Sequence, residues 1–102
     1  MSHGSGFITL WDYGGFSTTF RVKSNGKQTD SSRVVNAASS ASWSYDELYN
    51  YGFRDGDDCW VSADIEGGVT NHESGQNFTF SNPLNVQYHI SGGLWNPSWN
   101  RD

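Results

Sequence analysis

Residues 85–99, NVQYHISGGLWNPSW, form the most informative segment of the chain. Apolar Val86, Tyr88 and Ile90 alternate with polar residues, which is the pattern of a half-buried β-strand. The strand runs into a pair of glycines, and Trp95 and Trp99 follow on either side of a proline. Large aromatic residues beyond a strand either pack against the domain or are exposed and available to bind a ligand. The location of these two tryptophans therefore bears directly on function.

Short strands of the same kind precede this segment, separated by turns rich in Gly, Asn and Ser. We expect them at residues 7–11, 16–23, 33–35, 57–65 and 77–80. Together they predict an all-β fold, a small antiparallel β-sandwich of six or seven strands with its last strand ending at Ile90.

Local patterns refine three of these elements. In residues 57–65 the alternation puts Cys59 and the apolar residues that follow it on one face, with Trp60 opposite. The Asn25-Gly26 pair after the second strand suits a type I′ hairpin turn. Residues 46–52 are compatible with one helical turn that ends at a glycine, or with a loop.

The length of 102 residues predicts one domain over residues 7–102, with residues 1–6 as a flexible N-terminal tail or a remnant of expression. Sixteen per cent of the residues are aromatic, so the core rests on a few large rings, and we expect Trp11, Trp43 and Trp60 among them. The single cysteine excludes an internal disulfide. With no apolar signal sequence and no apolar membrane span, we expect a cytoplasmic protein, or one secreted without a recognisable signal peptide.

Charge and motifs exclude several functions. Eleven acidic and six basic residues give a net charge of -5, which argues against nucleic acid as a partner. The segment 54–58, which has three aspartates, lacks the ligand spacing of a calcium loop, and the three histidines lack the spacing of a zinc site, so we predict no metal and no cofactor. No nucleophile motif is present, and we predict no catalytic residues. Paired carboxylates, as in a glycosidase, remain the enzymatic alternative; the candidates are Asp46, Glu47, Asp64, Glu66 and Glu73.

A series of segments in one order resembles a known family. They are residues 13–22 (YGGFSTTFRV), 25–27 (NGK), 41–44 (ASWS), 58–63 (DCWVSA) and 85–97 (NVQYHISGGLWNP). The series resembles the C-terminal membrane-recognition domain of the cholesterol-dependent (thiol-activated) cytolysins, here as a stand-alone domain without the pore-forming part. The resemblance covers nearly the whole chain from about residue 6 and implies a β-sandwich whose tip loops converge at one end. Those loops are residues 13–16, 36–40, 67–73 and 93–96.

The membrane-binding residues of that family transfer poorly. Its tryptophan-rich, cysteine-bearing loop falls on residues 64–73, which contain neither residue type. Its sterol-contacting threonine-leucine pair falls on Gly93 and Leu94, so only the leucine is kept.

The residues left at the predicted tip suit a sugar, because aromatic rings stack on apolar sugar faces while amides, carboxylates and imidazoles bind hydroxyl groups. We therefore predict a lectin, a non-enzymatic carbohydrate-binding protein whose partners are glycans or glycoconjugates on cell surfaces, with membrane contact secondary. If it agglutinates cells, it needs several sites and we expect a homo-oligomer. The alternatives are a sterol- or lipid-binding membrane module and a structural protein-interaction domain. The predicted ligand-binding residues are Tyr13, Asn36, Asn71, His72, Glu73, Trp95, Asn96 and Trp99.

Overall fold

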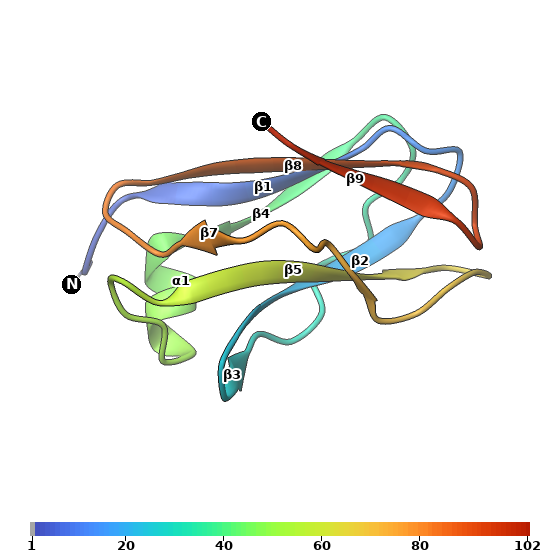
Figure 1. Ribbon diagram of the computed structural model, residues 1–102. Coiled ribbons are helices and arrows are strands. Elements are labelled where there is room, and N and C mark those ends of the chain that lie inside the picture. Colours follow the sequence, from blue (N-terminus) through green and yellow to red (C-terminus); the bar gives the residue numbers. More distant parts are fainter. Residues whose placement is uncertain (1) are drawn as a thin grey trace.

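Two β-sheets lie face to face with the core between them, and one short helix closes the space at one end (Figure 1). This arrangement comes from a computed structural model that describes residues 2–102. The elements in chain order are β1 (Gly6–Asp12), β2 (Thr18–Ser24), β3 (Lys27–Gln28), β4 (Ser40–Ser44), α1 (Tyr45–Asn50), β5 (Asp58–Ile65), β6 (His72–Glu73), β7 (Phe78–Thr79), β8 (Leu84–Gly92) and β9 (Pro97–Arg101). The fold is mostly β and sandwich-like, as the spacing of the strands predicted.

The sheet with strand order β4-β1-β8-β9 is mixed, which the sequence analysis did not predict. β1 and β8 run parallel over their length, from the pair Gly6 and Leu84 to the pair Asp12 and Ile90, whereas β4 and β9 pair antiparallel. The expectation of a purely antiparallel sandwich was therefore wrong for this sheet. A parallel pair needs no local turn between its strands, so turn signals along the chain do not reveal it.

The second sheet is antiparallel, in the order β3-β2-β5-β6, and β7 pairs with the start of β5. The predicted strand at residues 33–35 is reduced to a single bridge between Val35 and Thr18. The Asn25-Gly26 hairpin joins β2 to β3 as expected, with Ser24 opposite Lys27. Its turn type differs from the prediction, because only Gly26 has a positive φ (74°) and a type I′ turn needs two such residues.

The core forms where the inward residues of the two sheets meet. Ile8 and Leu10 of β1 are fully buried, as are Tyr88 and Ile90 of β8. In β5, the residues Cys59, Val61, Ala63 and Ile65 are buried, which confirms the predicted face. Two tryptophans expected in the core lie elsewhere: Trp11 and Trp60 are only half-buried and point to the outer faces of their sheets, while Trp43 packs against the core.

The helix α1 decides between the two alternatives for residues 46–52 in favour of a helical turn. Ser44 accepts a hydrogen bond from the backbone of Glu47, whose side chain accepts from the Ser44 backbone, so a capping box sets its start. Gly52, with φ at 99°, ends the turn that follows. The backbone amides of His3 and Gly4 donate to the Asp46 carboxylate, which brings the N-terminal segment against this helix.

The structure adds three strands that were not predicted, β4, β6 and β9. β9 extends the chain beyond Ile90 and pairs with β8, with Trp99 opposite Ile90. Trp99 is therefore a strand residue, and only residues 93–96 form the loop between β8 and β9. Among the described residues, no helix is long and apolar enough to cross a membrane.

Candidate functional site

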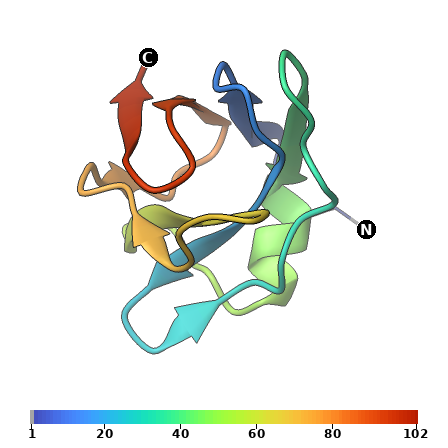
Figure 2. The ribbon, with the colours of Figure 1, turned by 90° about the vertical axis from the view of Figure 1, so that its right-hand side faces the viewer.

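Four loops meet at one end of the sandwich, the right-hand end in Figure 1, which faces the viewer in Figure 2. The loop at residues 13–17 is joined to the loop at residues 36–39 by the backbone, since the amide of Asp12 donates to the carbonyl of Ser39 at 2.9 Å. The Ser17 hydroxyl donates to the Asn36 side chain at 2.8 Å, and the Glu66 amide donates to the Ser17 carbonyl at 2.9 Å. We call this the tip; its loops are residues 13–17, 36–39, 66–71 and 93–96.

The loop between β8 and β9 is fixed to its neighbour at the tip. The Val69 amide donates to the Leu94 carbonyl at 2.9 Å, and Gly68 lies so close that a Cβ atom there would be 2.2 Å from the same oxygen. On this loop Trp95 is 72% exposed and Leu94 is 40% exposed. The backbone is therefore held in place while the indole ring of Trp95 faces solvent.

The exposed surface of the tip has little charge. The four loops contain no lysine or arginine, and Glu66 is their only exposed carboxylate. Beside them, Asp12 is fully buried; its Oδ1 accepts from the Gly14 amide at 2.9 Å, and its Oδ2 has no partner. Burial raises the pKa of Asp12 to about 6, because the charged form loses its hydration.

His72 and Glu73, both predicted for the site, point to opposite faces of their sheet. His72 pairs with the inward Ala63 and stacks parallel to Trp99, with ring centroids 6.4 Å apart. The Glu73 carboxylate accepts hydrogen bonds at 3.4 Å from Lys23 and from the Trp60 indole on the outer face. These two neighbours cannot contact one ligand together.

Trp99 is also separated from Trp95. It is half-buried, packs edge-on against Tyr88 with ring centroids 6.0 Å apart, and contacts the core. Its indole nitrogen is buried without a hydrogen-bond partner. We therefore assign Trp99 a packing role.

Tyr13 begins the first loop of the tip, but its ring lies on the outer face of the mixed sheet beside His89, with ring centroids 4.9 Å apart. The remaining predicted residues stay at the tip: Asn36 on the second loop, Asn71 on the third, and Asn96 next to Trp95. Asn71 has a left-handed φ of 51°, and its amide donates to the Asp64 carboxylate at 2.7 Å. Of the eight predicted residues, Asn36, Asn71, Trp95 and Asn96 therefore form the tip set.

Sequence analysis missed the exposed side chains of β1. Phe7 is 57% exposed, and Trp11 on the same face donates its indole N–H to Gln87 of β8 at 3.0 Å. The sequence shows that β1 carries apolar residues on both faces, which indicates that some of them are exposed. Which face turns to solvent becomes known only from the pairing of β1 with β8.

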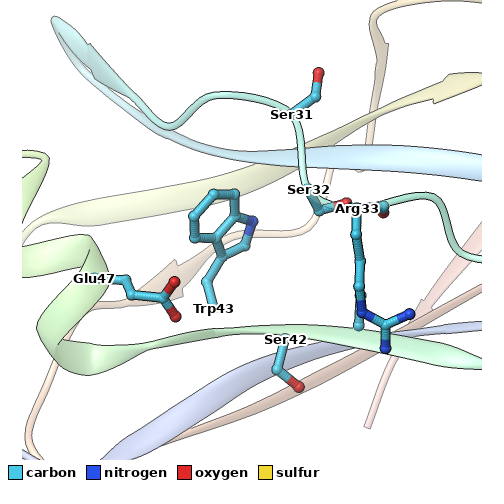
Figure 3. A pocket seen from close by; sticks show the side chains of 7 residues that line it. Ser31, Ser32, Arg33, Ser42, Trp43 and Glu47 are labelled. Atoms are coloured by element: carbon cyan, nitrogen blue, oxygen red, sulfur yellow. Dashed lines mark hydrogen bonds between the residues drawn. The ribbon is translucent and has the colours of Figure 1, made fainter.

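A hollow of about 240 Å³ lies between residues 31–33 and β4, beside the Trp43 ring (Figure 3). Its polar groups are engaged in local structure: Arg33 donates to the Ser40 carbonyl, and Glu47 completes the capping box. Trp43 packs edge-on against Tyr51, and its indole nitrogen has no hydrogen-bond partner. None of the predicted site residues lines this hollow.

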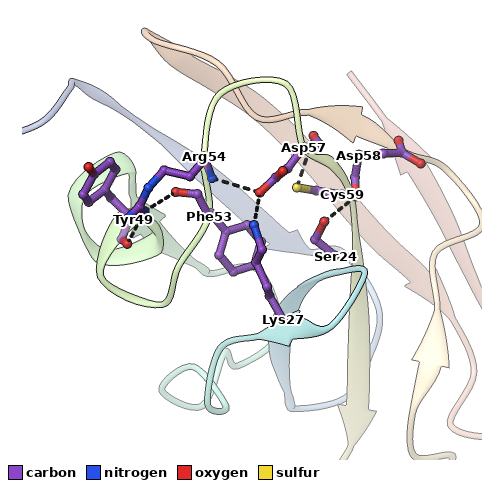
Figure 4. Close-up of polar contacts among 8 residues, drawn as sticks. All are labelled: Ser24, Lys27, Tyr49, Phe53, Arg54, Asp57, Asp58 and Cys59. Atoms are coloured by element: carbon purple, nitrogen blue, oxygen red, sulfur yellow. Dashed lines mark hydrogen bonds and ion pairs between the residues drawn. The ribbon is translucent and has the colours of Figure 1, made fainter.

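The acidic turn at residues 54–58 is held by hydrogen bonds among its side chains, its backbone and neighbouring residues (Figure 4). The Asp57 carboxylate accepts from Lys27 and from the Arg54 amide, and the hydrogen bond from Lys27 is the main reason that its pKa is lowered. Asp58 accepts from the Asn77 side chain at 2.9 Å. Burial raises the pKa of the neighbouring Cys59 thiol to about 11, which keeps it protonated near neutrality. Among residues 2–102, no cluster of three metal-binding side chains is present.

Comparisons with known proteins inform only the fold. No protein-family model matches the chain, and no curated protein matches it in sequence. The chain is similar in structure to a protein from Eubacterium rectale solved by NMR, with a TM-score of 0.54 and 10% sequence identity. The similarity covers 97% of this chain and 89% of that one. At this identity the match supports the same fold and says nothing of activity.

Proposed function

We propose that this protein is a lectin, a non-enzymatic carbohydrate-binding protein that binds its ligand at the tip. The observation that carries the proposal is Trp95, whose side chain is 72% exposed on a loop held by Gly68 and Val69. A large ring that is exposed yet positioned by a fixed backbone loses little entropy when a ligand stacks on it. The C–H face of a pyranose ring is such a ligand.

The polar groups of the tip support a sugar rather than an ion. Asn36, Asn71 and Asn96 are exposed, and each amide offers both donors and an acceptor to hydroxyl groups. The absence of lysine and arginine from the four loops disfavours phosphate or sulfate as the main determinant.

We further propose that the chain is a relative of the cytolysin C-terminal domain. Three observations support this: the ordered series of similar segments, the two-sheet architecture, and the four loops gathered at one end. The pore-forming part of that family is not needed for a glycan-binding role. Glycans or glycoconjugates at cell surfaces are the partners that fit.

A glycan array with the fluorescently labelled protein tests the proposal. The wild-type protein is expected to prefer a defined set of sugars, and Trp95→Ala is expected to lose that binding while its melting temperature stays nearly unchanged. Tyr51→Ala is the matched control, because it removes another exposed aromatic ring, 38% exposed at the end of α1, away from the tip. An array without signal at high protein concentration would contradict the proposal.

Red-cell agglutination and light scattering address valency. An agglutinating lectin of this size needs at least two sites per particle, so we expect a homo-oligomer in that case. A sugar that blocks the array is also expected to block agglutination.

A second candidate is a sterol- or lipid-binding membrane module, favoured by Leu94, which is 40% exposed next to Trp95. An adjacent leucine and tryptophan are suited to a shallow position at the lipid–water interface. Flotation with vesicles with and without cholesterol separates the two candidates. Co-flotation that needs Leu94 and is insensitive to sugars would favour this second function.

A further inference from the structure

The outer face of the mixed sheet is open to solvent. No described element covers it in either view of the ribbon, because α1 and the second sheet lie on the other side (Figures 1 and 2). Strand pairing defines which side chains it carries, since residues opposite each other point to the same face. We call it the sheet face; its residues are Phe7, Thr9, Trp11, Ser40, Ser42, Ser44, Asn85, Gln87, His89, Ser91, Ser98 and Asn100.

The strand residues of the sheet face include no Lys, Arg, Asp or Glu, and one carboxylate, that of Asp102, lies beside them just beyond β9. Apart from the aromatic rings, the strand side chains are hydroxyls and amides, with one imidazole on the central strand β8, where His89 lies 3.3 Å from the carboxylate of Asp102. In a chain with a net charge of -5, such a surface favours an uncharged partner, because away from Asp102 a charged group brought there loses hydration without gaining a counter-charge.

Aromatic rings form a row along β1 on this face. Phe7 and Trp11 lie on the strand and Tyr13 follows directly, with its ring tilted by 36° against that of His89. From Phe7 to Tyr13 the row is roughly 20 Å long at the rise of a β-strand. It therefore matches an extended chain better than one compact ring.

The row is oriented and flanked by polar groups. The Trp11 indole N–H donates to Gln87, and the hydroxyls of Thr9 and Ser42 share a hydrogen bond of 2.7 Å. Beside Phe7 lies a shallow hollow of about 450 Å³, lined also by Thr9, Asn85 and Gln87. The Gln87 amide and the Asn85 side chain thus stand next to apolar rings on a nearly flat surface.

We propose that the sheet face is a second binding surface, for an extended, uncharged polysaccharide that lies along β1. The rings of Phe7, Trp11 and Tyr13 stack on the apolar faces of successive sugar units. Asn85 and Gln87 bind their hydroxyl groups. This surface adjoins the tip at Tyr13, the first residue of the loop at 13–17, but does not include Trp95, and together the two give a single chain two saccharide sites.

Depletion of the intact protein from solution by suspended microcrystalline cellulose, chitin and insoluble β-1,3-glucan tests the proposal. At least one of the three is expected to bind, equally well in low and high salt. Phe7→Ser is expected to weaken the association about tenfold without unfolding the protein, because this ring is exposed. Gln87→Ala is the second variant, and it too is expected to weaken binding.

Trp95→Ala is the matched control and is expected to leave the depletion unchanged, so loss of the tip site and loss of the sheet face give different results. No depletion by any of the three suspensions would overturn the proposal, as would Phe7→Ser binding like the wild type. Light scattering of the wild type and of Phe7→Ser tests whether a second copy of the chain covers this face. A wild-type dimer that Phe7→Ser converts to monomers would overturn the proposal.

Discussion

Gly68 and the carbonyl oxygen of Leu94 are in direct contact. A Cβ atom on Gly68 would lie 2.2 Å from that oxygen, well inside any real contact distance, and the next amide, that of Val69, donates to it at 2.9 Å. Two loops far apart in the chain are joined here by backbone alone. This contact fixes the position of the loop that carries the exposed Trp95.

We expect Gly68→Ala to push the loop of residues 93–96 away from its neighbour. Relief of the clash requires backbone movement, so the free energy of unfolding should fall by about 1 to 3 kcal/mol. Glycan binding should weaken as well, because the Trp95 ring is displaced. Urea denaturation and a glycan-binding titration measure the two effects.

Gly15→Ala is the control for this substitution. Gly15 belongs to another loop of the tip, a Cβ atom added to it would meet no heavy atom within 4 Å, and its φ is not positive. Its replacement should change stability by less than about 0.5 kcal/mol. Equal losses for the two variants would show that the tip does not depend on the contact between Gly68 and Leu94.

The fold was predictable where patterns are local. Alternation in β5 identified its buried face, whereas residues 46–52 were compatible with either a helical turn or a loop. The parallel pairing of β1 with β8 was not predictable, because it joins strands nearly the whole chain apart. That pairing decides which face of β1 turns to solvent.

The site was predictable only in part, for a related reason. Neighbouring residues of a loop lie in the same place, so Trp95 and Asn96 are both at the tip. The side chains of consecutive residues in a strand point to opposite faces of the sheet. His72 and Glu73 therefore face opposite sides of β6. Trp99 was misplaced because the sequence shows no clear alternation in β9, where the strand carries mostly polar residues.

Asp12 predicts a specific dependence of stability on pH. Its pKa is raised to about 6 in the folded protein from an ordinary 3.8, so the folded state binds the proton more tightly than the unfolded state. The free energy of unfolding should therefore be highest, as far as Asp12 is concerned, below pH 3.8 and fall as the pH rises to about 6. A shift of about 2 pH units corresponds to about 3 kcal/mol.

Urea denaturation between pH 4 and 8 measures this dependence, and Asp12→Asn isolates it. The variant keeps an oxygen to accept from the Gly14 amide but cannot ionise. Its stability should vary less over the pH range in which Asp12 titrates. Parallel curves for the two proteins would mean that the carboxyl group is hydrated in solution.

The ion pair between Lys27 and Asp57 should contribute measurably to stability. Both side chains are about three-quarters buried, at 29% and 25% exposure, and the same carboxylate accepts from the Arg54 amide. Asp57→Asn is therefore expected to lower the free energy of unfolding by about 1 to 2 kcal/mol at pH 7. Because the folded pKa of Asp57 is lowered, its contribution is present above its unfolded pKa of 3.8 and is lost as the pH falls below that value.

Asp58→Asn is the control for Asp57, since Asp58 is exposed and its carboxylate accepts only from the Asn77 side chain. Chemical denaturation at neutral pH should show a change of less than about 0.5 kcal/mol. A similar loss in both variants would assign the effect to net charge rather than to the pair.

Trp95 and Trp99 lie on either side of Pro97, and replacement of each by alanine should have opposite consequences. Trp95 is 72% exposed, so Trp95→Ala should change the free energy of unfolding by less than about 1 kcal/mol. Trp99 packs on Tyr88, with ring centroids 6.0 Å apart, and stacks on His72, so Trp99→Ala leaves a cavity and should cost about 3 kcal/mol or more. Thermal denaturation of the two variants beside a glycan-binding titration separates the roles, since Trp95→Ala should lose binding and remain stable. A large loss of stability for Trp95→Ala would instead make its ring part of the core and remove the support for a sugar site at the tip.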